Sequence, residues 1–383
     1  MEKNKPNIAI YMYSMAGGGA ERVVSYLLPY LKNQGFEVVL VLMNNTIDYD
    51  LPKDIPIHYL ETSKSTEHGI YKLIKLPVLA YKYARLLKNL KITHSLSMLS
   101  RPCYVNLMAR WFTNHKYKLI ISERNYPSLQ YGYGDLQSKI NTYLVKKLYP
   151  QADLVVSNAG ASAVDLIENF NVDPSKTRVI HNPIDLDKIN AITPITNFFD
   201  TNYINLVSVG RLQVSKNQKL LLQAVAPFEK VRLYIFGEGE LRQELEEQIL
   251  KLSLTDRVFL MGFESNPFQY LKSADFFIFG SIHEGFPNVL LEAMCCGLPI
   301  LTTNCKSGPD EIMELKHPKT DDIMITDYGI LTPVGNLEML QKGLAYCLEH
   351  PEFLKSCRIR VMERIQDFKR EPILEAYTRH ILS

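Results

Sequence analysis

Two glutamates bracket the segment EGFPNVLLE, and their spacing points to a binding site for a hydroxylated ligand. They are Glu284 and Glu292. Eight positions along one continuous α-helix would set the two carboxylates about 80° apart, so they would not share a face. We therefore expect Glu284 to lie in a loop after a buried strand. Glu292 should lie one turn inside a helix entered through Pro287 and Asn288.

The first turn of this helix should place backbone donors between two side chains that only accept hydrogen bonds. The first N–H groups, those of Asn288, Val289 and Leu290, have no intrahelical acceptor and can bind an anion. The flanking carboxylates accept hydrogen bonds from hydroxyl groups. A sugar nucleotide carries both a phosphate and hydroxyls, so it suits the segment. The two carboxylates alone also fit a purely structural interpretation. Glu284 would then be an acidic residue at a helix N-terminus, and Glu292 an exposed glutamate on the helix.

Two other segments carry groups that suit a diphosphate. Arg211 and Lys216 follow an apolar run that we predict as a strand. Arg211 offers a planar guanidinium with several N–H donors, and Lys216 offers a compact ammonium charge. The run Gly17–Gly19 follows the first predicted strand, where glycines allow backbone N–H groups to approach a ligand closely. This run is not the GxGxxG fingerprint and no acidic residue follows at the ribose spacing, which disfavours NAD binding. Solvated charges and a plain turn remain the alternatives.

These segments resemble motifs of the retaining glycosyltransferases of family 4, whose Glu-x7-Glu motif corresponds to Glu284 and Glu292. Eight motifs occur in the family's order and together span nearly the whole chain. They are GGGAER at 17–22, SERN at 122–125, HNPID at 181–185, GRLQVSKN at 210–217, FGEGELR at 236–242, EGFPNVLLEA at 284–293, SGPDEI at 307–312 and YGILTPVGN at 328–336.

The resemblance implies an α/β fold of the GT-B type, with two doubly wound Rossmann-like domains facing across a cleft. It implies that Arg211 and Lys216 neutralise the leaving nucleotide diphosphate without a metal ion or other cofactor. Glu284 would orient the sugar hydroxyls and Glu292 the ribose. The remaining donor contacts would come from Gly18, Gly19, Phe263, Phe286, Pro287, Asn288, Val289 and Leu290.

Arg124 is a departure from the family pattern, because many relatives carry a histidine near this position. An arginine stays protonated and is no general base. We therefore expect Arg124 to join Glu284, Arg211 and Lys216 in the catalytic set as a sugar, phosphate or acceptor contact.

Short apolar runs alternate with helical stretches, which predicts two parallel sheets wrapped by helices. We expect one domain over 1–190 for the acceptor and another over 191–365 for the nucleotide sugar. By resemblance, a final helix at about 366–383 crosses back onto the first domain. Strands are expected at 8–13, 38–43, 93–97, 119–122, 154–157, 178–181, 204–209, 232–237, 258–262, 276–279 and 300–303.

Composition places the 383 residues among ordinary globular proteins, with 46% hydrophobic and 22% charged residues. Residues 1–14 lack the pattern of a signal peptide, and no run of about 18 apolar residues occurs. The six cysteines show no zinc-binding spacing, which favours the cytosol.

The charge is uneven: residues 1–190 carry 23 Lys and Arg against 16 Asp and Glu, whereas the remainder carries 20 against 25. Net charges of +7 and −5 suggest that only the first half meets an anionic surface. Basic amphipathic stretches at 70–92 and near 139–147 could lie on the inner membrane leaflet, although ordinary surface helices fit them equally well. The cations are Lys75, Lys82, Arg85 and Lys88, with Lys139, Lys146 and Lys147.

The leading prediction is a cytoplasmic retaining glycosyltransferase of cell-surface polysaccharide synthesis, with no nucleic acid partner. It would move a hexose or N-acetylhexosamine from a nucleotide sugar, with UDP favoured, to a saccharide or lipid-linked acceptor. A glucan synthase or phosphorylase of the same fold and a silent nucleotide-sugar-binding subunit are the alternatives. The intact set of Arg211, Lys216, Glu284 and Glu292 argues against the silent subunit.

Overall fold

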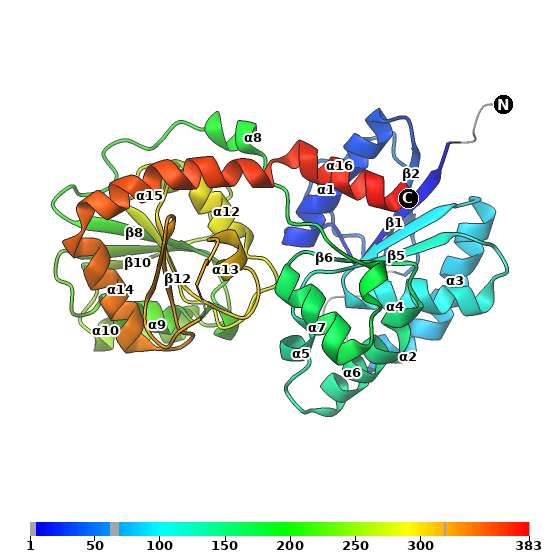
Figure 1. Cartoon of the computed structure of the whole chain (residues 1–383), viewed down its shortest axis with the longest axis horizontal. Coiled ribbons are helices and arrows are strands. Elements are labelled where there is room, and N and C mark those ends of the chain that lie inside the picture. Colours follow the sequence, from blue (N-terminus) through cyan, green and yellow to red (C-terminus); the bar gives the residue numbers. More distant parts are fainter. Residues whose placement is uncertain (1–4, 62–68, 318, 383) are drawn as a thin grey trace. The chain divides into compact units, whose positions relative to one another are not determined.

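The computed structural model describes residues 5–61, 69–317 and 319–382, and the chain divides into two compact units (Figure 1). Unit 1 comprises the chain up to Pro183 together with the segment from Arg370 onward, and unit 2 comprises Ile184–Lys369. The first crossing therefore comes before residue 190, because helix α8 (Leu186–Asn190) packs against unit 2 through its contact with α12. The second crossing, at 369/370, lies close to the predicted start of the final helix.

Unit 1 contains a seven-stranded parallel sheet in the order β3-β2-β1-β4-β5-β6-β7. Successive side chains of a strand point to opposite faces, so a sheet covered on both faces needs apolar residues throughout. The five residues Ile8–Met12 of β1 are all buried, as this predicts. The strands are β1 Asn7–Met12, β2 Glu37–Leu42, β3 Ile57–Tyr59, β4 His94–Met98, β5 Lys118–Glu123, β6 Leu154–Ser157 and β7 Thr177–Val179.

The helices of unit 1 form two layers, with α1 and α16 in contact on one side of the sheet (Figure 1). On the other side, α4 is buried almost throughout and contacts both α3 and α6. Ala9 and Tyr11 join these helices in one hydrophobic core. The helices are α1 Gly19–Asn33, α2 Gly69–Ile74, α3 Leu76–Asn89, α4 Ser100–Ala109, α5 Pro127–Gln130, α6 Leu136–Leu148, α7 Gly160–Phe170 and α16 Arg370–Leu382.

Unit 2 contains a second seven-stranded sheet in the order β10-β9-β8-β11-β12-β14-β13. All pairs are parallel except the edge pair β13–β14, which is antiparallel. The strands are β8 Ile204–Val209, β9 Val231–Phe236, β10 Val258–Gly262, β11 Phe276–Phe279, β12 Ile300–Thr303, β13 Met324–Thr326 and β14 Gly329–Thr332. The helices besides α8 are α9 Gln218–Val225, α10 Arg242–Lys251, α11 Phe268–Leu271, α12 Asn288–Cys295, α13 Pro309–Ile312, α14 Leu337–Glu349 and α15 Pro351–Arg364.

The predicted α/β class is confirmed, and each expected strand is present with small shifts at its ends. In both sheets the strand order reverses beside the first strand of the unit, between β1 and β4 and between β8 and β11. Such switch points are where open α/β sheets bind ligands, beyond the carboxyl ends of the strands. No helix in the described part of the chain has the length and apolar character needed to span a membrane.

Candidate active site

The switch point of unit 2 brings together two segments that lie far apart in sequence. Strand β8 pairs with β11, so the loops that follow these two strands emerge side by side. The β8 loop carries Arg211 and Lys216, and the β11 loop carries Ser281 and Glu284. Three residues of the predicted catalytic set therefore belong to adjoining loops.

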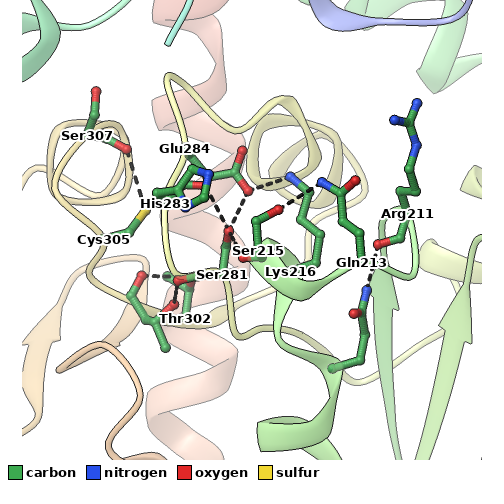
Figure 2. Close-up of polar contacts among 12 residues, drawn as sticks. Arg211, Gln213, Ser215, Lys216, Ser281, His283, Glu284, Thr302, Cys305 and Ser307 are labelled. Carbon is green, nitrogen blue, oxygen red and sulfur yellow. Dashed lines mark hydrogen bonds and ion pairs between the residues drawn. The ribbon is translucent and has the colours of Figure 1, made fainter. Parts of the chain in front are cut away.

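An ion pair joins the two loops at their centre. The Lys216 Nζ lies 2.5 Å from Glu284 Oε1, and both side chains are largely withdrawn from solvent (Figure 2). The Lys216 ammonium also lies 5.5 Å from the centroid of the Phe279 ring. A cation held in this partly desolvated position interacts more strongly with an incoming phosphate than a solvated lysine would.

A hydroxyl group from the same loop holds the Glu284 carboxylate in place. The Ser281 hydroxyl lies 2.7 Å from Glu284 Oε1 and 2.9 Å from the Ser215 carbonyl oxygen. The Thr303 hydroxyl donates to the Ser281 carbonyl over 2.6 Å, which ties the β11 loop to the end of β12. Ser281 was not among the predicted site residues. Its position could have indicated a role, because it lies just after a predicted strand and three residues before Glu284.

Helix α12 begins at Asn288, with Pro287 as its N-cap residue, so Glu284 precedes the helix and Glu292 lies inside it as expected. One expectation is wrong: the N–H of Leu290 is not free, because it donates to the Pro287 carbonyl over 3.1 Å. A first helical turn often tightens in this way, which removes one amide from the predicted anion site. Glu292 is only 6% exposed, which excludes the alternative of an exposed helix glutamate.

The loop before α12 is held by close packing against the SGPDEI segment. Gly308 has φ +98°, and a Cβ there would lie 2.4 Å from Pro287 Cδ and 3.1 Å from Phe286 Cα. Only glycine both adopts this positive φ readily and leaves room for the neighbouring Pro287 and Phe286 atoms. The Ser307 hydroxyl donates to the Gly285 carbonyl over 2.6 Å, and the buried Phe286 ring packs 5.7 Å from that of Phe368. The packing of Pro287 on Gly308 and of Phe286 on Phe368 thus fixes the position of the loop.

Arg211 and Phe263 are the exposed members of the predicted donor site. The Arg211 side chain is exposed, and its guanidinium points away from the Lys216–Glu284 pair (Figure 2). Its backbone carbonyl accepts from Gln218 Nε2 over 2.9 Å, which anchors the start of the loop. Phe263 directly follows strand β10 and is 79% exposed. Both side chains are accessible to a ligand.

The glycine run of unit 1 follows β1 and leads into α1, as predicted. The Gly17 N–H donates to Asp48 over 3.1 Å, and the Tyr49 hydroxyl donates to the Gly18 carbonyl over 2.9 Å. Gly18 is the N-cap residue and Gly19 the first residue of the helix. The Glu21 carboxylate folds back to 2.3 Å from where a Gly18 Cβ would lie. Burial raises the pKa of Glu21, with its own backbone N–H and the Arg124 charge opposing that shift.

The structure places Arg124 in the interior of unit 1, where it is 6% exposed. Its guanidinium donates to the Tyr377 hydroxyl over 2.8 Å and forms a short hydrogen bond with Asn182. Arg124 therefore links the end of strand β5 to helix α16 and to the segment just before the first crossing. These contacts use both terminal nitrogens of the guanidinium inside unit 1, while its buried Nε has no hydrogen-bond partner among the described residues.

The neighbouring Glu123 is fully buried, and burial raises its pKa. Hydrogen bonds from the Tyr149 hydroxyl at 2.9 Å and from the N–H groups of Arg124 and Asn125 oppose that shift. The SERN motif thus has a structural role in this unit. At the unit 1 switch point, Arg101 follows β4 and forms a two-pronged ion pair with Glu61, a placement that no motif in the sequence indicated.

Two family models together match most of the chain. The model described as Glycosyltransferase Family 4 matches residues 17–188, and that described as Glycosyl transferases group 1 matches residues 193–363. A Campylobacter jejuni protein is 38% identical over 376 residues, which cover 98% of this chain and 99% of that protein. It is named N-acetylgalactosamine-N,N'-diacetylbacillosaminyl-diphospho-undecaprenol 4-alpha-N-acetylgalactosaminyltransferase. The chain belongs to the family 4 and group 1 glycosyltransferases.

Solved structures show that this glycosyltransferase has the GT-B fold. HepE of Anabaena, crystallised in complex with UDP, aligns with a TM-score of 0.77 and 19% identity over 97% of this chain and 98% of that one. A sucrose-phosphate synthase from Thermosynechococcus elongatus aligns with a TM-score of 0.82 and 18% identity over 98% of each chain. With the curated relative, these findings make the protein a hexosyltransferase.

The arrangement in unit 2 can bind a ligand with anionic and hydroxylated parts. Lys216 and Arg211 offer positive charge, and Glu284 and Glu292 offer acceptors at either side of the α12 N-terminus. Among the described residues, no group of three or more His, Cys, Asp or Glu side chains could hold a metal ion.

Proposed function

We propose that this glycosyltransferase moves an N-acetylhexosamine or hexose from a UDP-linked donor to a lipid-linked saccharide, with retention of the anomeric configuration. The observation that carries the proposal is the Lys216–Glu284 pair at the switch point of unit 2, beside the first turn of α12. The protein would serve cell-surface polysaccharide synthesis. We assign donor binding to unit 2 and acceptor binding to unit 1.

The choice of donor rests on the chemistry of the unit 2 loops and on two relatives. Phe263 offers an exposed ring to a nucleobase, Glu292 an acceptor to the ribose, and Arg211 and Lys216 positive charge to the diphosphate. HepE of Anabaena binds UDP, and the name of the Campylobacter relative specifies an N-acetylgalactosaminyl group. We therefore favour UDP-N-acetylgalactosamine, with UDP-N-acetylglucosamine and UDP-galactose next.

The choice of acceptor rests on the same Campylobacter relative, whose name describes a saccharide on diphospho-undecaprenol. The excess of positive charge in residues 1–190 suits an acceptor presented at an anionic membrane surface. We infer that the protein works in the cytoplasm, peripherally on the inner leaflet.

The proposed reaction is a front-face displacement. The bond between the sugar C1 and the β-phosphate oxygen breaks, and its electron pair leaves with the UDP. The acceptor oxygen bonds to C1 on the same face and passes its proton to the departing phosphate oxygen. Lys216 and Arg211 stabilise the charge that grows on that phosphate, while Glu284 holds the sugar hydroxyls. Stabilisation that strengthens in the transition state is what accelerates the step.

Positive charge from Arg211 and Lys216 would take the place of a divalent metal. We therefore expect full turnover in EDTA. Loss of turnover with EDTA and its recovery with Mg²⁺ or Mn²⁺ would contradict this part of the proposal.

The whole proposal is tested by offering UDP-sugars with a diphosphopolyprenol-linked N-acetylated disaccharide and following UDP release. We expect turnover with a UDP-N-acetylhexosamine and an α-linked product by NMR from an α-linked donor. A β-linked product would contradict retention. UDP binding without any transfer would favour a silent binding subunit.

A further inference from the structure

We propose that the outer surface formed by α3 and by the turn η1 (Arg110–Phe112), which follows α4, docks on an anionic lipid bilayer by inserting apolar side chains at the interface. This inference rests on the proposed lipid-linked acceptor, since docking would bring the enzyme to it. We define the docking patch as Ile74, Val78, Tyr81, Trp111 and Phe112, together with the cations Lys82, Arg85 and Lys88.

The apolar members of the docking patch are exposed although each is large. Ile74 is 66% exposed and Trp111 is 57% exposed, with Val78, Tyr81 and Phe112 also in the exposed class. They gather at one place, because α3 contacts η1 and the Tyr81 and Phe112 rings meet edge to face at 6.1 Å. Exposed apolar groups that form a contiguous patch mark interaction sites, whereas scattered ones do not.

Helix α3 has two faces, and the fold uses only one of them. Leu76, Leu79, Tyr83 and Leu87 are buried in the core of unit 1. Val78, Tyr81, Lys82 and Arg85 follow at i, i+3, i+4 and i+7, so they line the opposite, exposed face. The apolar groups of this outer face lie outside the hydrophobic core of unit 1.

The charge around the patch selects an anionic partner. From residue 68 to residue 122 the sequence contains ten Lys and Arg and no Asp or Glu, although Arg101 and Arg110 pair with the carboxylates of Glu61 and Asp153. Arg85 lies with its guanidinium 6.0 Å from the Tyr81 ring, so cation and aromatic group share one surface. Tryptophan and tyrosine prefer the water–hydrocarbon interface, and lysine and arginine prefer anionic headgroups. A bilayer presents both environments over an extended area.

A second stripe of the same kind lies on α6, at the other side of α4. Helix α4 is buried and contacts both α3 and α6, so these two helices supply the outer surface of their layer. Leu136 and Tyr143 are exposed on α6, and Tyr133 is exposed in the loop before it. Exposed lysines accompany them at 139, 146 and 147. A broad planar partner contacts both stripes more readily than a small ligand does.

Trp111 makes the test direct, because it is the only tryptophan in the chain. Vesicles of phosphatidylglycerol and phosphatidylethanolamine should shift its fluorescence to shorter wavelength at low salt, and vesicles of phosphatidylcholine should not. Lys82→Glu, Arg85→Glu and Lys88→Glu keep the reporter and should each weaken binding roughly fivefold or more. Trp111→Ser with Phe112→Ser, followed by co-sedimentation, should lower vesicle binding at least tenfold.

A matched control lies in unit 2, where Leu250 and Lys251 are also an exposed apolar residue and its neighbouring cation. Leu250→Ser with Lys251→Glu should leave vesicle binding unchanged. The transfer reaction is then measured with the acceptor in vesicles and with a short-chain, water-soluble acceptor. Docking variants should lose activity only with vesicles, and loss with both acceptors would overturn the inference.

Failure of docking and failure of the proposed function have different readouts. An unshifted Trp111 spectrum with anionic vesicles overturns the docking patch even if transfer proceeds. Vesicle binding without transfer from any UDP-sugar contradicts the proposed function instead. If the wild type sediments as a dimer, ignores vesicles, and becomes a monomer on Trp111→Ser, the patch is a protein interface and the inference is wrong.

Discussion

Arg124 and Arg211 both follow a parallel strand at its carboxyl end, yet their environments are opposite. Arg124 follows β5 in unit 1, where it is buried and bonded to Tyr377 and Asn182. Arg211 follows β8 in unit 2, where its side chain is exposed and its guanidinium points away from the Lys216–Glu284 pair. A buried guanidinium that is hydrogen-bonded to distant side chains of the same unit stabilises the fold, whereas an accessible one can bind a ligand. The residue type and the strand end alone do not distinguish the two.

The largest effect should come from removing the buried arginine. Arg124→Ala removes two buried hydrogen bonds of a charged group, those to Tyr377 and Asn182, so it should lower the free energy of unfolding by about 3 kcal/mol or more. Urea unfolding measures this loss. Tyr377→Phe, which removes one hydrogen bond, should cost only about 1 kcal/mol. If Arg124→Ala keeps wild-type stability but abolishes transfer, Arg124 is a substrate contact as the sequence first indicated.

A smaller effect, on turnover and not on stability, should follow from Glu284→Gln in unit 2. The sugar hydroxyls lose a charged acceptor worth about 1.5–3 kcal/mol, which predicts transfer at least tenfold slower. UDP affinity should not fall, because Lys216 loses the carboxylate that now holds it. Steady-state kinetics with the lipid-linked acceptor, together with UDP titration, separates the two quantities. Weaker UDP binding with unchanged turnover would reverse these roles.

The smallest effect concerns the pH dependence of stability in unit 1. Burial raises the pKa of Glu123 above its unfolded value, so the protonated form favours the native state. This contribution is fully present below the unfolded pKa and is lost as the pH rises through the folded one. The Tm of the wild type relative to Glu123→Gln should therefore fall as the pH rises from 4 to 8. A constant Tm difference would show that Glu123 does not titrate in this range.

The sequence was sufficient to predict the strands that are apolar runs, because a buried strand in a parallel sheet must be apolar on both faces. It was not sufficient for the edge strands β3 and β13, which are only partly buried, or for β14, which begins with a glycine. The side-by-side placement of the β8 and β11 loops depends on strand order, which no local pattern records.

The candidate site, like the fold, was predictable from the sequence only in part. The types and spacing of Lys216, Glu284 and Glu292 identified the segment, and α12 begins where Pro287 and Asn288 indicated. The interior position of Arg124 was not predictable, because its partners Asn182 and Tyr377 come from distant parts of the sequence. The hydrogen bond from the Leu290 N–H to the Pro287 carbonyl was not predictable either, because it depends on how tightly the first helical turn is wound.

Calorimetric titration of UDP shows whether the loops of unit 2 form the nucleotide site. Lys216→Ala and Glu292→Ala each remove one charged contact and should weaken UDP binding by about 1.5–3 kcal/mol, or roughly 10- to 100-fold. Lys219→Ala is the matched control, because Lys219 lies in the same segment but pairs with Glu244 at the surface, and it should bind UDP like the wild type. Wild-type affinity for UDP in both Lys216→Ala and Glu292→Ala would contradict the account.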